Sequence, residues 1–155
     1  MRSRGDLSLG ERPGFLVRRL HQIHLALFAE ECGRFKVTPV QYSVLTALER
    51  HGPLDQASLA VAVGIDRVNA TGVLSRLEAR GLIQRDPDPG DRRIKRCALR
   101  ALGRNFARRM AAAVERCHRR TVAALPARER RNFLTSLERL VRANNALGRA
   151  RLRLE

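Results

Sequence analysis

The chain has 155 residues, a length that suits one compact domain with helical extensions, and 44% of them are hydrophobic. The formal net charge is +16, from 31 Lys and Arg residues against 15 Asp and Glu residues. Such an excess indicates a polyanionic partner, most often nucleic acid. Lysine occurs only at Lys36 and Lys95, so the charge is almost all arginine, which the codon bias of a GC-rich genome also explains in part.

The N-terminal segment, residues 1–12, is polar and charged, and we expect it to be a mobile basic arm. It lacks the apolar run of a signal peptide, and no run in the chain approaches the ~20 apolar residues that span a bilayer. We therefore expect a cytoplasmic, nucleoid-associated protein with no membrane partner. The irregular spacing of Cys32, Cys97 and Cys117 excludes a disulfide framework and a paired metal motif.

Two helices are predicted before residue 52. The first starts at Pro13 and ends at Cys32-Gly33, and its apolar residues recur every three or four positions, as on one face of a helix. These residues are Leu16, Leu20, Ile23 and Leu27. The second helix has Thr38 as its N-cap, Pro39 in its first turn and Gln41 completing a capping box, and it stops at residues 51–53, HGP.

Two shorter helices and a hairpin follow. Asp55 caps the third predicted helix, which ends near Val63, and Asp66 caps the fourth, which runs to Arg80 with Gly81 beyond its end. Residues 82–85 and 94–99 predict two strands, joined by a loop over 86–93 that is rich in Asp, Pro and Gly.

The rest of the chain predicts two helices, the first beginning at Gly103 and Pro126 separating it from the second. The first has a seam along Phe106, Met110, Ala113, Cys117, Thr121 and Ala124, and the second has one along Leu134, Leu137, Val141 and Asn144. The predicted fold is mainly α with a small β-hairpin. Residues 38–100 form a winged helix-turn-helix, and residues 13–33 and 103–150 form a flanking helical region.

The third and fourth helices have the features of a helix-turn-helix. Ala60 is small enough to let two helices cross closely, and Gly64 suits the left-handed backbone of the turn. Apolar residues at fixed offsets fill the corner: Leu59, Val63, Ile65, Ala70 and Val73. An ordinary αα-hairpin can show the same spacing, so the pattern alone favours DNA binding without settling it.

The fourth helix is the predicted recognition helix. We expect Arg67 to bind guanine, Asn69 to bind adenine and Arg76 to contact phosphate. Gly72 is unfavourable inside a helix, and either close approach of DNA or a ligand, or simple tolerance, explains it. The DNA contacts predicted on the two helices are Gln56, Ser58, Arg67, Val68, Asn69, Thr71, Ser75 and Arg76.

The hairpin loop is the predicted wing. Arg93 is the candidate for the minor groove, where the potential is negative, and Arg92 and Lys95 add positive charge beside it. Asp91 belongs to the same contact region, but we expect it to accept hydrogen bonds from loop amides or from Arg93 and so to hold the shape of the wing. The alternative is a solvated charged hairpin.

Together these elements resemble the MarR family of bacterial transcription regulators. Residues 91–103, DRRIKRCALRALG, have the family's Asp-x-Arg wing, a strand that ends in Leu99 and a glycine in the next helix. Residues 37–42 and 74–83 are also similar to family segments. Where this chain has Arg100, the family usually has a Thr that caps the following helix, so we expect a weaker or different cap here.

The resemblance implies an obligate homodimer in which residues 13–33 and 103–150 form the dimerisation region. Its two recognition helices would contact a palindrome with half-sites ~10 bp apart. The resemblance also implies an effector pocket between this region and the DNA-binding lobe, with Arg19, His24, Phe28, Tyr42, Asp66 and Asn69 as candidate residues. A ligand that touches both lobes changes their spacing and releases DNA. Alternatively, Phe28 and Tyr42 are core residues and Arg19 is a surface charge.

The segment 12–21, RPGFLVRRLH, is similar to family members that regulate aromatic-compound catabolism. The expected function is therefore a ligand-responsive repressor, with an aromatic acid or its CoA thioester as effector. Urate-responsive relatives use a tryptophan in the first helix. This chain has no tryptophan, which counts against urate as the effector. The alternatives are a sequence-tolerant architectural DNA-binding protein and a cysteine-based redox sensor, although buried structural cysteines are the better interpretation.

No cofactor or metal is expected. His21 and His24 lie three residues apart on a helix, but no carboxylate or cysteine completes a zinc set. The sequence has no phosphate-binding glycine loop and no nucleophile–base arrangement, so we do not predict an enzyme.

Overall fold

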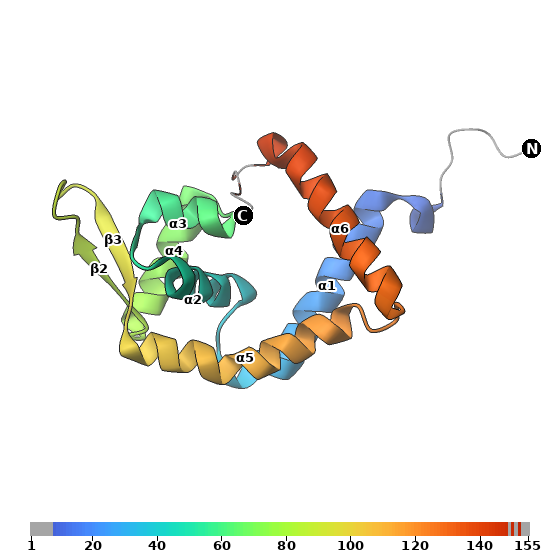
Figure 1. Cartoon of the computed structure of the whole chain (residues 1–155), viewed down its shortest axis with the longest axis horizontal. Helices are drawn as coiled ribbons and strands as arrows, with labels where there is room; N and C mark the ends of the chain where they lie inside the picture. Colours follow the sequence, from blue (N-terminus) through green and yellow to red (C-terminus); the bar gives the residue numbers. More distant parts are fainter. Residues whose placement is uncertain (1–7, 149, 151, 153–155) are drawn as a thin grey trace, which may run out of the picture.

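The structure is a computed structural model and describes residues 8–148, 150 and 152. Figure 1 shows a lobe of helices and a β-hairpin at one end, helices that cross at the other end, and a long helix that joins the two ends. The elements in chain order are η1 (Leu9–Glu11), α1 (Pro13–Cys32), η2 (Gly33–Phe35), α2 (Pro39–His51), β1 (Leu54–Asp55), α3 (Gln56–Val63), α4 (Arg67–Ala79), β2 (Ile83–Pro87), β3 (Lys95–Leu99), α5 (Ala101–Thr121), α6 (Ala127–Asn144) and η3 (Asn145–Leu147).

The predicted basic arm, residues 1–12, is described only in its second half. Residues 1–7 lie outside the described residues, and Leu9–Glu11 forms a short 3-10 helix. The carboxylate of Glu11 accepts hydrogen bonds from the hydroxyl and the amide of Ser8, both at 2.8 Å, and these bonds lower the pKa of Glu11.

The three predicted N-caps are confirmed. Thr38 accepts from the amide of Gln41 and forms the expected capping box, Asp55 caps α3, and Asp66 caps α4. These side chains satisfy amides that the first turn of a helix leaves without partners. Local sequence therefore fixes where each helix of the lobe begins.

The sheet has three antiparallel strands in the order β1-β3-β2. The predicted hairpin is present, but β2 extends to Pro87 instead of ending at residue 85, and β3 begins at Lys95 instead of Ile94. The strand β1, which pairs Leu54 with Cys97, was not predicted because two residues carry no alternation pattern.

Helix α5 begins two residues earlier than predicted and ends at Thr121, so Ala124 is not part of it. Arg100 is its N-cap and makes no side-chain capping bond, as expected from the missing Thr. Gly103 instead fixes this helix against the sheet. A Cβ atom there would lie 2.1 Å from the carbonyl oxygen of Leu82, so only glycine fits this crossing.

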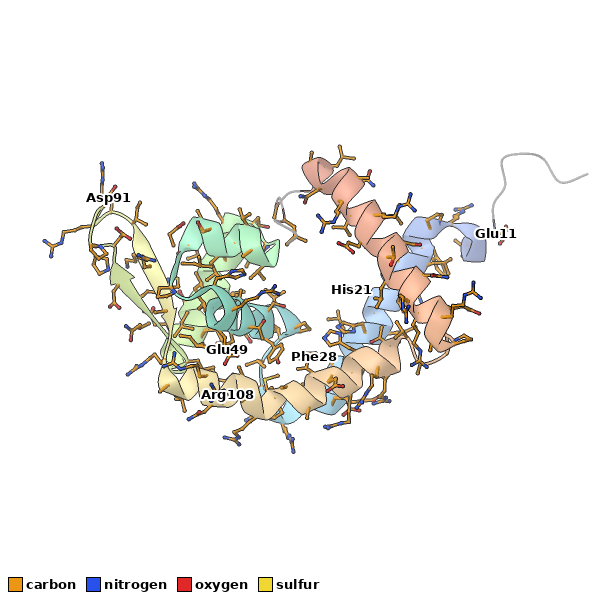
Figure 2. The ribbon with its side chains drawn as sticks, in the orientation of Figure 1. Glu11, His21, Phe28, Glu49, Asp91 and Arg108 are labelled. Atoms are coloured by element: carbon orange, nitrogen blue, oxygen red, sulfur yellow. The ribbon has the colours of Figure 1, made fainter. Side chains whose placement is uncertain are left out.

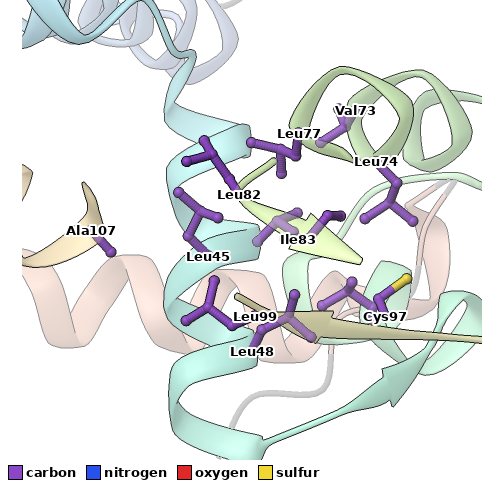
Figure 3. Close-up of a cluster of buried hydrophobic side chains, with 12 residues drawn as sticks. Leu45, Leu48, Val73, Leu74, Leu77, Leu82, Ile83, Cys97, Leu99 and Ala107 are labelled. Carbon is purple, nitrogen blue, oxygen red and sulfur yellow. The ribbon is translucent and has the colours of Figure 1, made fainter. Parts of the chain in front are cut away.

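Two hydrophobic clusters hold the fold together. The first fills the lobe between α2, α4 and the sheet, as Figure 3 shows for residues such as Leu45, Leu77 and Ile83. The second lies where α1 packs on α5 and includes Phe28 and Met110. Helix α6, by contrast, contributes no buried residue.

Among the described residues, no single helix is long and apolar enough to cross a membrane. The pair α3 and α4 meets the length and composition criteria only together, and it is bent by 103°. Three leucines of this pair, Leu59, Leu74 and Leu77, are buried in the core of the lobe.

Candidate nucleic-acid interface and ligand cavity

Helices α3 and α4 form the predicted helix-turn-helix. Their axes turn by 103°, within the range of the motif, and Gly64 has a left-handed φ of 74° at the turn. The carbonyl of Ala60 accepts hydrogen bonds from the amides of Gly64 and Ile65 at 2.8 and 3.0 Å. Both residues that indicated the motif in the sequence therefore lie at its corner.

The outer face of α4 presents the predicted contact residues. Ala70, Val73, Leu74 and Leu77 are buried against the core. The opposite face exposes Arg67, Val68, Asn69, Thr71, Ser75 and Arg76. Val68 is 84% exposed, and a Cβ atom added at Gly72 would meet nothing within 4 Å. Packing within the chain therefore does not explain the glycine.

Hydrogen bonds within the lobe occupy two of the polar side chains on this face. The amide nitrogen Nδ2 of Asn69 donates to the carboxylate of Asp66 at 2.7 Å. The amide nitrogen Nε2 of Gln56 donates to the hydroxyl of Thr71 at 2.9 Å. Asn69 therefore supports the start of α4, and Gln56 connects α3 to α4.

Arg85 on β2 joins the sheet to the recognition helix. Its guanidinium binds the carboxylate of Glu78 and donates to the hydroxyl of Ser75 at 3.3 Å. The hydrogen bond from Arg85 is the main reason that the pKa of Glu78 is lowered. The arginine thus neutralises a carboxylate on the helix expected to approach phosphates. Sequence reasoning missed this role because the contact forms only in the folded sheet.

The wing is shaped by its aspartates, and Figure 2 shows Asp91 at its tip. The carboxylate of Asp91 accepts hydrogen bonds from the guanidinium Nε of Arg93 at 3.1 Å and from the Arg93 amide at 3.0 Å, and these bonds lower the pKa of Asp91. The predicted structural role of Asp91 is confirmed. The Arg93 side chain remains 91% exposed, so it is held in place yet available to a partner.

Of the other predicted contact residues, the one on α3 supports the fold and those on the wing are exposed. Ser58 donates its hydroxyl to the Asp55 carboxylate at 2.5 Å and so reinforces the cap of α3. Arg92 and Lys95 are exposed on the wing. Arg96, which was not predicted as a site residue, donates to the carbonyl of Pro53 at 3.0 Å and ties β3 to the loop before β1.

An open cavity of about 950 Å³ lies between α1, the end of α5 and α6. Its wall is mainly apolar, with Leu16, Ile23 and Leu134 among the lining residues, and Arg19 and His24 contribute polar groups. Figure 2 shows His21, which also lines the cavity, on α1 in the region that faces α6. The cavity therefore offers cationic and imidazole groups beside an apolar surface.

The ring of His24, on α1, contacts two residues of α5. Its Nδ1 lies 2.9 Å from the hydroxyl of Thr121, and its ring stacks on His118 with centroids 5.5 Å apart. Burial lowers the pKa of His24, and the nearby His118 and His21 lower it further. The neutral ring is therefore favoured, as a donor or acceptor of hydrogen bonds.

The structure brings together only two of the six predicted pocket residues, Arg19 and His24. Phe28 is 5% exposed and packs in the cluster between α1 and α5. Tyr42 contacts both hydrophobic clusters, and burial raises the pKa of its hydroxyl. The bonded pair at the start of α4, Asp66 and Asn69, does not line this cavity.

Arg80 at the end of α4 connects the DNA-binding lobe to the α1–α5 core. Its guanidinium donates to the carbonyls of Lys36 and Phe35 at 2.8 and 3.0 Å, and it lies 5.0 Å from the ring centroid of Phe106. Arg80 therefore links η2 and α5 to the end of α4.

The three cysteines are buried and have no disulfide partner. Burial raises the pKa of each thiol, for Cys97 to about 11, which disfavours the reactive thiolate. This supports a structural interpretation over redox sensing. In the described part of the chain, no three His, Cys, Asp or Glu side chains are arranged to hold a metal ion.

Comparisons with known proteins agree with this geometry. The MarR family profile matches residues 37–95. NicR of Pseudomonas putida, an HTH-type transcriptional repressor, is 33% identical over 89% of this chain and 87% of NicR. The structure of Bordetella bronchiseptica BpsR, whose DNA binding is regulated by 6-hydroxynicotinic acid, is 32% identical with a TM-score of 0.84, covering 88% of this chain and 97% of BpsR.

A further relative, the repressor CouR, has been solved bound to DNA and bound to a CoA thioester. CouR bound to a 23-mer DNA duplex is 29% identical with a TM-score of 0.77, covering 88% of this chain and 99% of CouR. CouR of Rhodococcus jostii RHA1 bound to p-coumaroyl-CoA is 28% identical with a TM-score of 0.74, covering 87% of this chain and 95% of CouR. The chain therefore belongs to the MarR family of transcriptional regulators, and it is not an enzyme.

Proposed function

We propose that this chain is a homodimeric repressor that binds a palindromic operator through α4 and the wing, and that a small aromatic effector releases it. The observation that carries the proposal is the pairing of an exposed α4 face with a wing arginine, Arg93, held by Asp91. The first element suits the major groove and the second suits the minor groove. The relative CouR is bound to a 23-mer DNA duplex, which supports DNA binding by this chain.

The proposed dimer rests on the apolar surface of α1 and α6. Helix α6 buries no residue, although Leu134, Leu140 and Val141 are large apolar side chains, 43–60% exposed. Of these, Leu134 lines the same open cavity as Leu16 and Val17 of α1, which are also exposed. A second copy of the chain would remove this surface from water, and it would place two recognition helices on one duplex.

Arg93→Ala is expected to weaken binding to the operator by about tenfold, or about 1.4 kcal/mol, because it removes the charge that the wing presents to the minor groove. Fluorescence anisotropy at constant salt measures this change. Arg128→Ala, which removes an exposed arginine on α6, is the control and should have a much smaller effect. Equal losses for the two variants would contradict the role of the wing.

The proposed effector site is the cavity that contains Arg19 and His24, and the expected effector class is an aromatic acid or its CoA thioester. BpsR is regulated by 6-hydroxynicotinic acid and CouR binds p-coumaroyl-CoA, which makes these two compounds the first probes. An effector at 100 times its Kd should stabilise the chain by ~2.7 kcal/mol and release DNA. Arg19→Ala should reduce both the stabilisation and the release of DNA by the probe. If both effects were unchanged in this variant, the proposed site would be wrong.

A further inference from the structure

The side chains on α4 that remain available for base contact are fewer than the sequence suggested. Asn69 is bonded to Asp66 and Thr71 to Gln56, and Ser75 accepts a bond from Arg85. The remaining exposed side chains predicted to contact DNA from α4, a helix described in full, are Arg67, Val68 and Arg76. Of these three, Val68 is the apolar one.

The exposure of Val68 has no explanation in the folding of the chain. A single exposed valine is common on protein surfaces, but this one is 84% exposed in the first turn of a recognition helix. Valine is also a weaker helix former than alanine. Neither packing nor helix formation therefore favours valine at this position.

Gly72 leaves the surface beside Val68 open. It follows Val68 by four residues and so lies on the same side of α4, one turn along. A Cβ atom there would meet nothing within 4 Å, so the chain itself does not require the missing side chain. Its effect is to lower the surface next to the valine, where the edge of a base pair can approach α4 closely.

We propose that Val68 recognises the 5-methyl group of a thymine in each half-site of the operator, and that Gly72 permits this contact. The inference rests on the proposed function and deepens it. The thymine methyl is the apolar group that the major groove presents, and the first turn of a recognition helix meets the base edges. Val68 therefore sets a sequence preference that neither arginine can supply.

The test begins with a duplex that the full-length chain enriches from a randomised library. Each thymine of its half-sites is then replaced by deoxyuridine, which removes the methyl group and keeps the base pairing. At one thymine position, which recurs by symmetry in both half-sites, fluorescence anisotropy should show that the affinity falls by about fourfold for each half-site changed. This is the effect expected when one buried methyl group is lost. Val68→Ala should bind the thymine duplex more weakly and lose nothing further on the deoxyuridine duplex.

Val61→Ala is the matched control, because it makes the same change at an exposed valine of α3 and should keep the full thymine dependence. Val68→Ala should unfold at a temperature no lower than the original chain, so a lost contact can be distinguished from lost folding. The inference is overturned if no deoxyuridine substitution weakens binding, or if Val68→Ala keeps the dependence. Failure to enrich any duplex would instead contradict the proposed function, and the inference with it.

Discussion

Gly103→Ala is expected to lower the free energy of unfolding by about 3 kcal/mol. The added Cβ atom would lie 2.1 Å from the Leu82 carbonyl oxygen and 2.8 Å from Cδ1 of Leu99. The Leu82 carbonyl accepts a hydrogen bond from the Arg100 amide at 3.0 Å, so the backbone cannot move away without weakening that bond. Chemical denaturation monitored by circular dichroism measures the change.

Gly33→Ala is the matched control for this substitution. Gly33 has a helical φ of −54° at the end of α1, and a Cβ atom there would meet nothing within 4 Å. We therefore expect a change of less than about 0.5 kcal/mol, as for other surface substitutions. If the Gly103→Ala chain were as stable as the Gly33→Ala chain, this result would contradict the close packing of α5 against Leu82 at Gly103.

Leu134→Asp is expected to convert the proposed homodimer to a monomer and to weaken operator binding by about a hundredfold or more. Leu134 lines the cavity between α1 and α6 and is 56% exposed in the single chain, so a carboxylate there disrupts the association and leaves the core intact. Sedimentation velocity measures the mass, and anisotropy measures the loss of affinity for DNA.

Leu102→Asp provides the control, because Leu102 is 57% exposed but lies in the first turn of α5, beside the lobe. This variant should remain dimeric. A Leu134→Asp chain that sediments as a dimer would contradict the proposed interface, while loss of the circular dichroism signal would show that the variant fails to fold. Leu140→Asp, at another exposed leucine of α6, then tests the same interface independently.

Features that depend on neighbouring residues were predictable from the sequence. The caps at Thr38, Asp55 and Asp66 follow from side chains that reach amides three residues away. The left-handed turns at Gly64 and Gly81 follow from the glycines themselves. The helix-turn-helix and the wing are combinations of such local signals, and for that reason their order along the chain indicated the fold.

Features that depend on distant residues were not predictable. Strand β1 exists only because β3, about forty residues later, pairs with it. The contacts of Arg80 with the Phe35 and Lys36 carbonyls, and of Arg96 with the Pro53 carbonyl, likewise join segments that the sequence does not connect. The start of α5 at Ala101 cannot be predicted in the same way, because its N-cap, Arg100, makes no side-chain capping bond.

The ligand cavity shows the same limit. The sequence placed Arg19 and His24 on one helix, but the partners that hold the His24 ring, Thr121 and His118, lie more than ninety residues further along. Phe28 is a core residue in the single chain, as the alternative interpretation expected. The polar residues of the cavity were therefore visible in the sequence, whereas the shape of the cavity was not.

The central claim, that this chain is a sequence-specific DNA-binding regulator, is tested most directly by comparing two duplexes at the same salt concentration. One is the palindrome that the full-length chain enriches from a randomised library, and the other is the same bases in scrambled order. The account predicts a preference of about a thousandfold or more for the palindrome, with two chains bound to each duplex. Equal affinity for the two duplexes would contradict it, because binding driven by phosphates alone shows little sequence preference.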